Sequence, residues 1–162
     1  MERQFINELH ALWEAAKKQA QTECERRSLS NMAEKYRVCR MFKGSEDLEQ
    51  LIALFTSPQG MEFCQSRHFP DMATLRRFKP YNVERFGVYI DAGEINLHNA
   101  PKVVLVGNTS ATLSYDNKGS HEVFLMHGAQ AAITASGWAM VFVTSEDGCT
   151  VIKTERDRAK IL

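Results

Sequence analysis

The chain lacks a net charge, a long apolar run and any paired-cysteine motif, and each absence excludes a class of function. Lysine plus arginine and aspartate plus glutamate number twenty each in 162 residues. A neutral total gives no general attraction to nucleic acid or to anionic lipid. No apolar run approaches the roughly 20 residues that span a bilayer, and the first residues lack the apolar core of a secretory signal. These absences predict a soluble, cytoplasmic protein.

The cysteines also lack the spacing of a metal site. Cys24, Cys39, Cys64 and Cys149 lie far apart, with no Cys-x-x-Cys pair. Cys64 and His68 are four residues apart, but structural zinc requires four ligands and no second pair lies nearby. The cysteines are expected to be small buried apolar residues. No metal and no cofactor are predicted.

Recognisable catalytic strings are missing too. The chain has no phosphate-binding glycine loop, no nucleophile elbow and no zinc-protease motif. Asp91 and Glu94 flank a glycine but form no row of acids, and His98, His121 and His127 occur singly. A non-enzymatic protein is therefore predicted. The alternative is a carbohydrate- or nucleotide-active enzyme on a solenoid surface, which would need a cleft with convergent acids and histidines.

The first half has helical periodicity. One apolar stripe at spacings of three and four predicts a helix from residue 1 to about 27. A second helix is expected from Ser45, as an N-cap, to Phe55. Ser57 and Pro58 can begin a third, and Met72 lies in a further short helical face.

From Gly87 onward, helical spacing gives way to strand alternation. The chain is thus divided into a helical cap (1–82) and a strand-repeat region (83–162). In the second region apolar residues recur at steps of ten, ten, ten, eight, ten and ten residues, at Val103, Leu113, Val123, Ile133, Val141, Val151 and Ile161. Apolar partners two residues away indicate strands with one buried face, and glycine, asparagine and aspartate between them mark tight turns.

Two architectures fit such an array. The inward residues follow the same order of sizes in nearly every unit, and the turns repeat in phase with them. This favours a short β-solenoid (β-helix) with coils of about 20 residues, preceded by the helical cap, in an α+β chain. The alternative is an antiparallel β-meander packed on helices.

Non-enzymatic protein interaction, or assembly into a homo-oligomer, is the predicted function. The last rung has no covering element in the sequence, so its edge is expected to pair with another copy or a partner. Several large apolar residues alternate with the inward positions, so they face outward, where either the helical cap covers them or a partner binds. The predicted interaction residues are Phe124, Met126, Trp138, Met140, Phe142, Ile161 and Leu162.

A basic segment offers the best contact with an anionic partner. Between residues 26 and 43 there are six cations and only Glu34 against them. Nucleic-acid binding through this segment is a weaker alternative, because it requires the cations to gather on one surface. The six residues are Arg26, Arg27, Lys35, Arg37, Arg40 and Lys43.

Three strings in the chain carry a resemblance. These are Gly60–Cys64 (GMEFC), Phe69–Pro70 and Gly87–Asp91 (GVYID), followed by the strand array. Together they resemble small bacterial proteins of uncharacterised activity from phages and mobile elements of gut bacteria. The resemblance implies a helical head and a β-solenoid tail. For the predicted interaction function, a phage or mobile-element protein would act on a host protein. The resemblance implies no catalytic residue.

Overall fold

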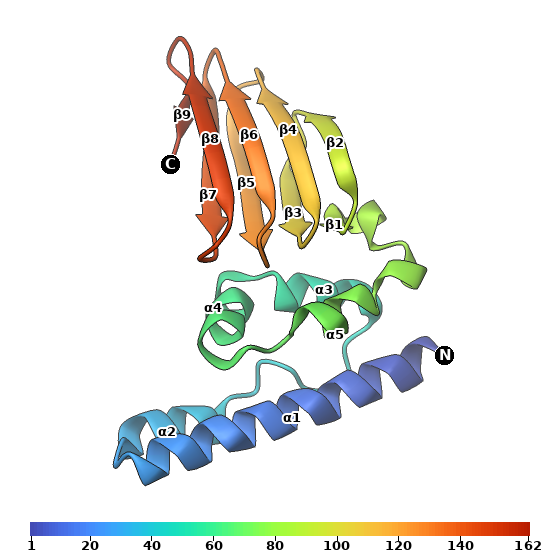
Figure 1. Ribbon diagram of the computed structural model, residues 1–162, viewed down its shortest axis with the longest axis vertical. Coiled ribbons are helices and arrows are strands. Elements are labelled where there is room, and N and C mark those ends of the chain that lie inside the picture. Colours follow the sequence, from blue (N-terminus) through green and yellow to red (C-terminus); the bar gives the residue numbers. More distant parts are fainter. The chain divides into compact units, whose positions relative to one another are not determined.

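The computed structural model describes residues 1–162, which form two compact units, Met1–Asp71 and Met72–Leu162 (Figure 1). The first unit is helical. None of the helices in the chain combines the length and the apolar character that crossing a bilayer demands. The helices of the first unit are α1 (Glu2–Arg26), α2 (Ser30–Val38), α3 (Leu48–Phe55) and α4 (Pro58–Arg67).

The core of the first unit is a chain of aromatic rings. Trp13 of α1 lies 5.9 Å from Phe42 between ring centroids, and Phe42 lies 5.8 Å from Phe55 of α3. Phe55 in turn meets Phe69 edge to face at 5.6 Å. Such edge-to-face pairs add to the free energy gained from burying the rings. The rings therefore join α1 and α3 to the segments that follow α2 and α4.

The helix starts confirm one prediction and correct another. Ser57 caps α4 as expected, because its Oγ accepts a hydrogen bond from the backbone N–H of Gly60. The second expected helix, however, begins at Leu48, and its N-cap is Asp47, not Ser45. Asp47 and Gln50 form a reciprocal capping box, which satisfies two backbone donors at once. This makes Asp47 the stronger start signal.

A helix that the sequence did not predict, α2, follows α1. Its nine residues bury only Ala33, so the apolar stripe that marks a helix in a sequence is missing. The helix is held by its packing on α1 and by an i,i+3 ion pair between Glu34 and Arg37.

The second unit contains one short α-helix, two 3-10 turns and nine strands. The expected division between residues 82 and 83 lies close to the change from helices to strands, whereas the compact units divide after Asp71, because residues 72–86 belong to the second unit. The elements are α5 (Met72–Arg76), η1 (Lys79–Tyr81), η2 (Val83–Phe86), β1 (Val88–Ile90), β2 (Gly93–His98), β3 (Lys102–Val106), β4 (Thr109–Tyr115), β5 (Gly119–Met126), β6 (Gln130–Ala135), β7 (Ala139–Ser145), β8 (Thr150–Glu155) and β9 (Lys160–Ile161).

The strands form a β-solenoid of about four turns, which confirms the predicted fold class. Odd-numbered strands make one parallel sheet, β1-β3-β5-β7-β9, and even-numbered strands make the other, β2-β4-β6-β8 (Figure 1). Every pairing is parallel and joins strands one coil apart. An antiparallel meander is thereby excluded, because it would pair strands that are consecutive in the chain.

The register corrects the repeat deduced from the sequence. Val103 pairs with Val123, and Val123 pairs with Val143, so each of these coils takes twenty residues. Val141 belongs to a different row, because it pairs with His121 and with Ile161. The eight-residue step in the sequence pattern is therefore a change of row, and the strict spacing of ten residues continues through Val143.

The interior of the solenoid contains one polar pair. His121 is buried at a position taken by Val141 in the next coil, and its ring lies 4.5 Å from that of Tyr115. The two ring nitrogens of His121 and the hydroxyl of Tyr115 all lack a hydrogen-bond partner. Burial also raises the pKa of Tyr115 to about 12. The pair is a weak point in an otherwise apolar core.

Candidate interaction surface

Strand β7, the turn before it and the residue after β9 expose a group of large apolar side chains at one end of the odd-numbered sheet. Alternation points the even-numbered residues of β7 out of the solenoid, and Leu162 flanks Phe142 through backbone hydrogen bonds to Val141 and Val143. The exposed fractions are 60% for Trp138, 37% for Met140, 41% for Phe142 and 55% for Leu162. We call these four residues the β7–β9 strip.

The remaining predicted interaction residues are not exposed. Phe124 and Met126 also point outward from β5, but they are only 4% and 0% exposed. Ile161 is buried too, because it pairs with Val141 and belongs to the core of the solenoid. Outward alternation alone does not make a residue accessible. The structure therefore removes these three residues from the predicted surface.

The strip remains apolar where its neighbours in the same rows are polar. Met140 pairs with Ser120 on one side and Lys160 on the other, and Phe142 pairs with Glu122. In the row of Phe124 the side chain becomes polar where the row becomes exposed, because the buried Phe124 pairs with the exposed Thr144. Large apolar side chains therefore persist at positions that solvent reaches.

Cations border the strip in the turns before β5 and β9. The guanidinium of Arg158 lies over the indole of Trp138, 5.2 Å from the ring centroid. Gly119 and Ala139 are paired in the ladder. Lys118 immediately precedes Gly119, and Trp138 immediately precedes Ala139, so the two residues lie in stacked turns. One aromatic ring thus stands in a stack of turns between two cationic positions. Arginine over an indole is a favourable cation–π geometry.

The acids of the same turns are occupied by contacts within the solenoid. Asp157 accepts a hydrogen bond from the backbone N–H of Gly137 at 3.0 Å. Glu155 accepts one from the backbone N–H of Ile161 and is 3.5 Å from Lys160. The Ile161 hydrogen bond, together with Lys160, lowers the pKa of Glu155 below its ordinary value. Lys118 and Arg158 have no carboxylate partner.

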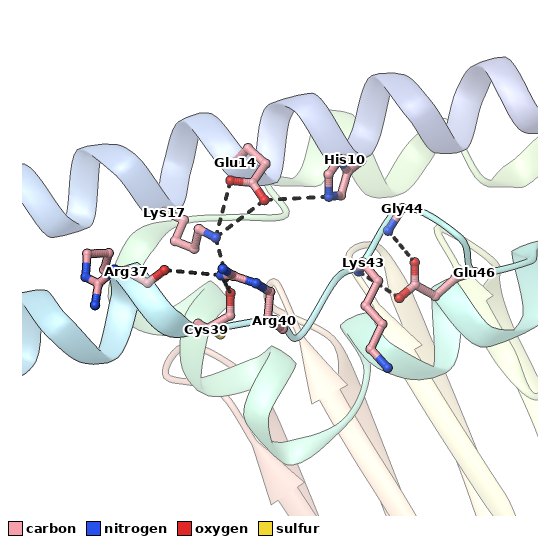
Figure 2. Close-up of polar contacts among 9 residues, drawn as sticks. All are labelled: His10, Glu14, Lys17, Arg37, Cys39, Arg40, Lys43, Gly44 and Glu46. Carbon is pink, nitrogen blue, oxygen red and sulfur yellow. Dashed lines mark hydrogen bonds and ion pairs between the residues drawn. The ribbon is translucent and has the colours of Figure 1, made fainter.

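The basic segment is exposed, but part of it is engaged in local contacts. Arg37 donates from Nε to Glu34 at 2.7 Å. Arg40 donates from Nη1 to the backbone oxygens of Arg37 and Cys39 (Figure 2). The Glu34 hydrogen bond raises the pKa of Arg37, which is charged in any case.

A buried lysine ties this segment to α1. Lys17 is only 7% exposed, and its Nζ lies 3.2 Å from the backbone oxygen of Cys39 and 4.5 Å from the centre of the Trp13 ring. Glu14 supplies the counter-charge at 3.3 Å (Figure 2). These contacts give the segment a structural role. The six predicted cations are spread over the end of α1, α2 and the following loop.

A cavity in the first unit escaped sequence reasoning. It has a volume of about 370 Å³ and lies between α2, the loop after it and α4. One wall holds Tyr36, whose hydroxyl accepts a hydrogen bond from Arg67 at 3.0 Å. Exposed charges of opposite sign, Lys35 and Glu62, stand at its rim. It was missed because α2 itself was not predicted. Its lining is Met32, Lys35, Tyr36, Cys39, Met41, Gln59, Glu62, Phe63 and Ser66.

The cysteines agree in part with their expected role. None forms a disulfide, and Cys24 and Cys64 are buried. Cys39 and Cys149 are partly exposed. Burial raises the pKa of the Cys149 thiol, so this thiol carries less thiolate than an ordinary cysteine.

Asp91 and His98, which the sequence offered as candidate catalytic residues, make separate polar contacts and do not converge on one site. Asp91 is 2.6 Å from Arg76 and accepts a hydrogen bond from the backbone N–H of Asn108. His98 lies 2.9 Å from the Ser114 hydroxyl and 3.4 Å from Asp116. This has the composition of a Ser-His-Asp triad, but the histidine is 60% exposed, and β4, which holds Ser114, is hydrogen-bonded on both sides. Triad chemistry also requires free backbone donors beside the nucleophile and exclusion of water.

The comparisons add no relative to this description. Neither protein-family models nor curated proteins nor solved structures yielded a match to the chain.

Proposed function

We propose that the chain is a non-enzymatic interaction module in which the solenoid presents the β7–β9 strip to a protein partner. The observation that carries the proposal is the exposure of Trp138, in the turn before β7, and of Met140 and Phe142 on β7, whose paired row positions are polar. Contiguous exposed apolar residues rimmed by polar ones are typical of protein interaction sites. A setting in phages or mobile elements remains part of this proposal.

The residue types support the same function. Tryptophan and arginine are the residues most often found at the energetic centre of protein interfaces. Here Trp138 and Arg158 lie against each other at the end of the strip. A parallel solenoid holds them on a hydrogen-bonded framework, so little conformational entropy is lost when a partner binds.

The size of the strip limits the kind of complex. A stable interface buries roughly 800 Å² per partner, which is more than four side chains supply. The surrounding polar and charged positions, Ser120, Glu122 and Lys160 among them, would therefore form the rim. Assembly through a second copy of the chain is the other form of the proposed function.

Matched variants test the proposal. The double substitution W138A/F142S removes the centre of the strip, and I152S removes an equally exposed apolar side chain, 62% accessible, from the other sheet. The immobilised wild type and both variants are used to capture proteins from a cell lysate. A protein captured by the wild type and by I152S, but not by the double variant, is purified, and its affinity for each of the three is measured by titration. Light scattering over a range of concentrations identifies self-assembly, which the double variant should abolish.

Two results would contradict this function. One is a captured partner that binds the double variant with unchanged affinity. The other is the absence of both self-association and any strip-dependent partner. Circular dichroism and the urea midpoint must first show that each variant is folded.

A further inference from the structure

We infer that the partner segment bound by the β7–β9 strip is an acidic, apolar peptide stretch of another protein. This inference rests on the proposed function and adds the chemistry of the partner. It follows from the charges that border the strip. The cations at the border are largely without ion pairs, whereas most of the acids are already hydrogen-bonded within the solenoid.

The positive side of the border is available. Lys118 and Arg158 are exposed in the turns on either side of the Trp138 turn and have no ion-pair partner. Lys160 stands beside Met140 in the ladder. The three cations therefore lie at the end of the strip where Trp138 begins it. A partner carboxylate at this end would gain from each of them without displacing an existing strong pair, except the 3.5 Å contact of Lys160.

Most acidic side chains near the strip already accept hydrogen bonds within the solenoid. Asp157 and Glu155 are held by backbone N–H groups of Gly137 and Ile161. Glu122, beside Phe142, makes no ion pair, because its other ladder neighbour, Lys102, lies over the ring of Phe124 instead. The border is therefore positive at the Trp138 end and negative next to Phe142. The predicted segment accordingly has its acidic residues at the Trp138 end and apolar residues over Met140 and Phe142.

The apolar content favours a peptide over other anionic partners. A nucleic acid would need a track of cations along its backbone, but the cations here gather at one end. An anionic membrane would be recognised by more basic residues around the apolar group, yet the acid Glu122 occupies the far side. Complementary charges at the rim of an apolar patch are typical of protein recognition.

Selection from a displayed library of random twelve-residue peptides tests the inference. The intact chain is the bait, and the folded double variant W138A/F142S serves for counter-selection. The expected result is enrichment of peptides that combine aspartate or glutamate with aromatic or aliphatic residues. Binding is then measured by fluorescence, because Trp138 is exposed while Trp13 is fully buried. The signal should vanish in W138F.

Charge reversal makes the test specific. R158E and K118E should each weaken binding of the enriched peptides at least about tenfold, since like charges at an interface are strongly unfavourable. K153E changes the net charge equally but lies on the other sheet, and should leave binding within about twofold. Matched peptides with lysine in place of each acid should not bind.

The outcomes separate the inference from the proposed function. Strip-dependent peptides without acidic enrichment would overturn the acidic partner and leave the interaction function standing. If no enriched peptide depends on the strip, both fail. A Trp138 signal with phosphatidylserine vesicles or with oligo(dT), but not with the selected peptides, would also overturn the inference.

Discussion

The guanidinium of Arg158 lies over the indole of Trp138, one coil away in the solenoid, at 5.2 Å from the ring centroid. The two residues are twenty positions apart in the sequence and meet because the coils in this part of the solenoid take twenty residues each. An exposed cation–π pair of this kind contributes about 0.5–1 kcal/mol. Arginine here shields one face of the ring and leaves the rest accessible.

Removing this arginine should expose the tryptophan further. R158A is expected to increase quenching of Trp138 fluorescence by acrylamide and to lower the free energy of unfolding by less than about 1 kcal/mol. Trp13 is fully buried, so the quenchable emission comes from Trp138. R156A, in the same turn, is the control. Equal quenching in both variants and the wild type would refute the packing of the pair.

Asp91 should make the second unit sensitive to acid. The Arg76 hydrogen bond, supported by the backbone N–H of Asn108, lowers the pKa of this carboxyl below its unfolded value of about 4. Its stabilisation is therefore fully present above about pH 4 and is lost as pH falls through the lowered folded-state pKa.

Urea unfolding at pH 7 and at pH 3 checks this dependence. D91N should be less stable than the wild type at pH 7, and the difference should shrink at pH 3. E94Q, whose exposed side chain makes no ion pair, is the control. A constant difference between D91N and the wild type at both pH values would contradict the role of the ionised carboxylate.

His121 should reduce stability as it stands. Its two ring nitrogens are buried without partners, and the next coil has Val141 in the same row. Because an unsatisfied buried polar group costs about 1–3 kcal/mol, H121V should raise the free energy of unfolding. Y115F tests the neighbouring unpaired hydroxyl in the same way. A loss of more than about 1 kcal/mol in H121V would mean that the histidine has a partner.

Gly107 should tolerate no side chain. Its φ is +66°, and an added Cβ would lie 2.5 Å from Oδ1 of Asp91 and 2.6 Å from the methyl of Met72. G107A is therefore expected to destabilise the second unit by more than G148A, whose cost comes from backbone strain alone, about 1 kcal/mol. Gly148 also has a positive φ but no atom within 4 Å of the added carbon. Equal thermal midpoints for the two variants would contradict this close approach.

Local signals in the sequence predicted much of the architecture. The Ser57 cap and the change from helix to strand near Gly87 follow from side-chain chemistry and periodicity over a few residues, so the chain reveals them directly. The twenty-residue coil follows from the ten-residue spacing of inward residues. The row assignment failed at Val141, because alternation gives the face of a residue but not which residue of the next coil it pairs with.

The candidate surface shows the same division. The sequence by itself determined that Phe124, Met140 and Phe142 point away from the solenoid interior, because strand geometry alone fixes the side of each residue. Only the tertiary structure decided that Phe124 is buried while Met140 and Phe142 are exposed. It alone also brought Arg158 onto Trp138. Burial and contact depend on which distant segments pack together, and local periodicity has no information about that choice.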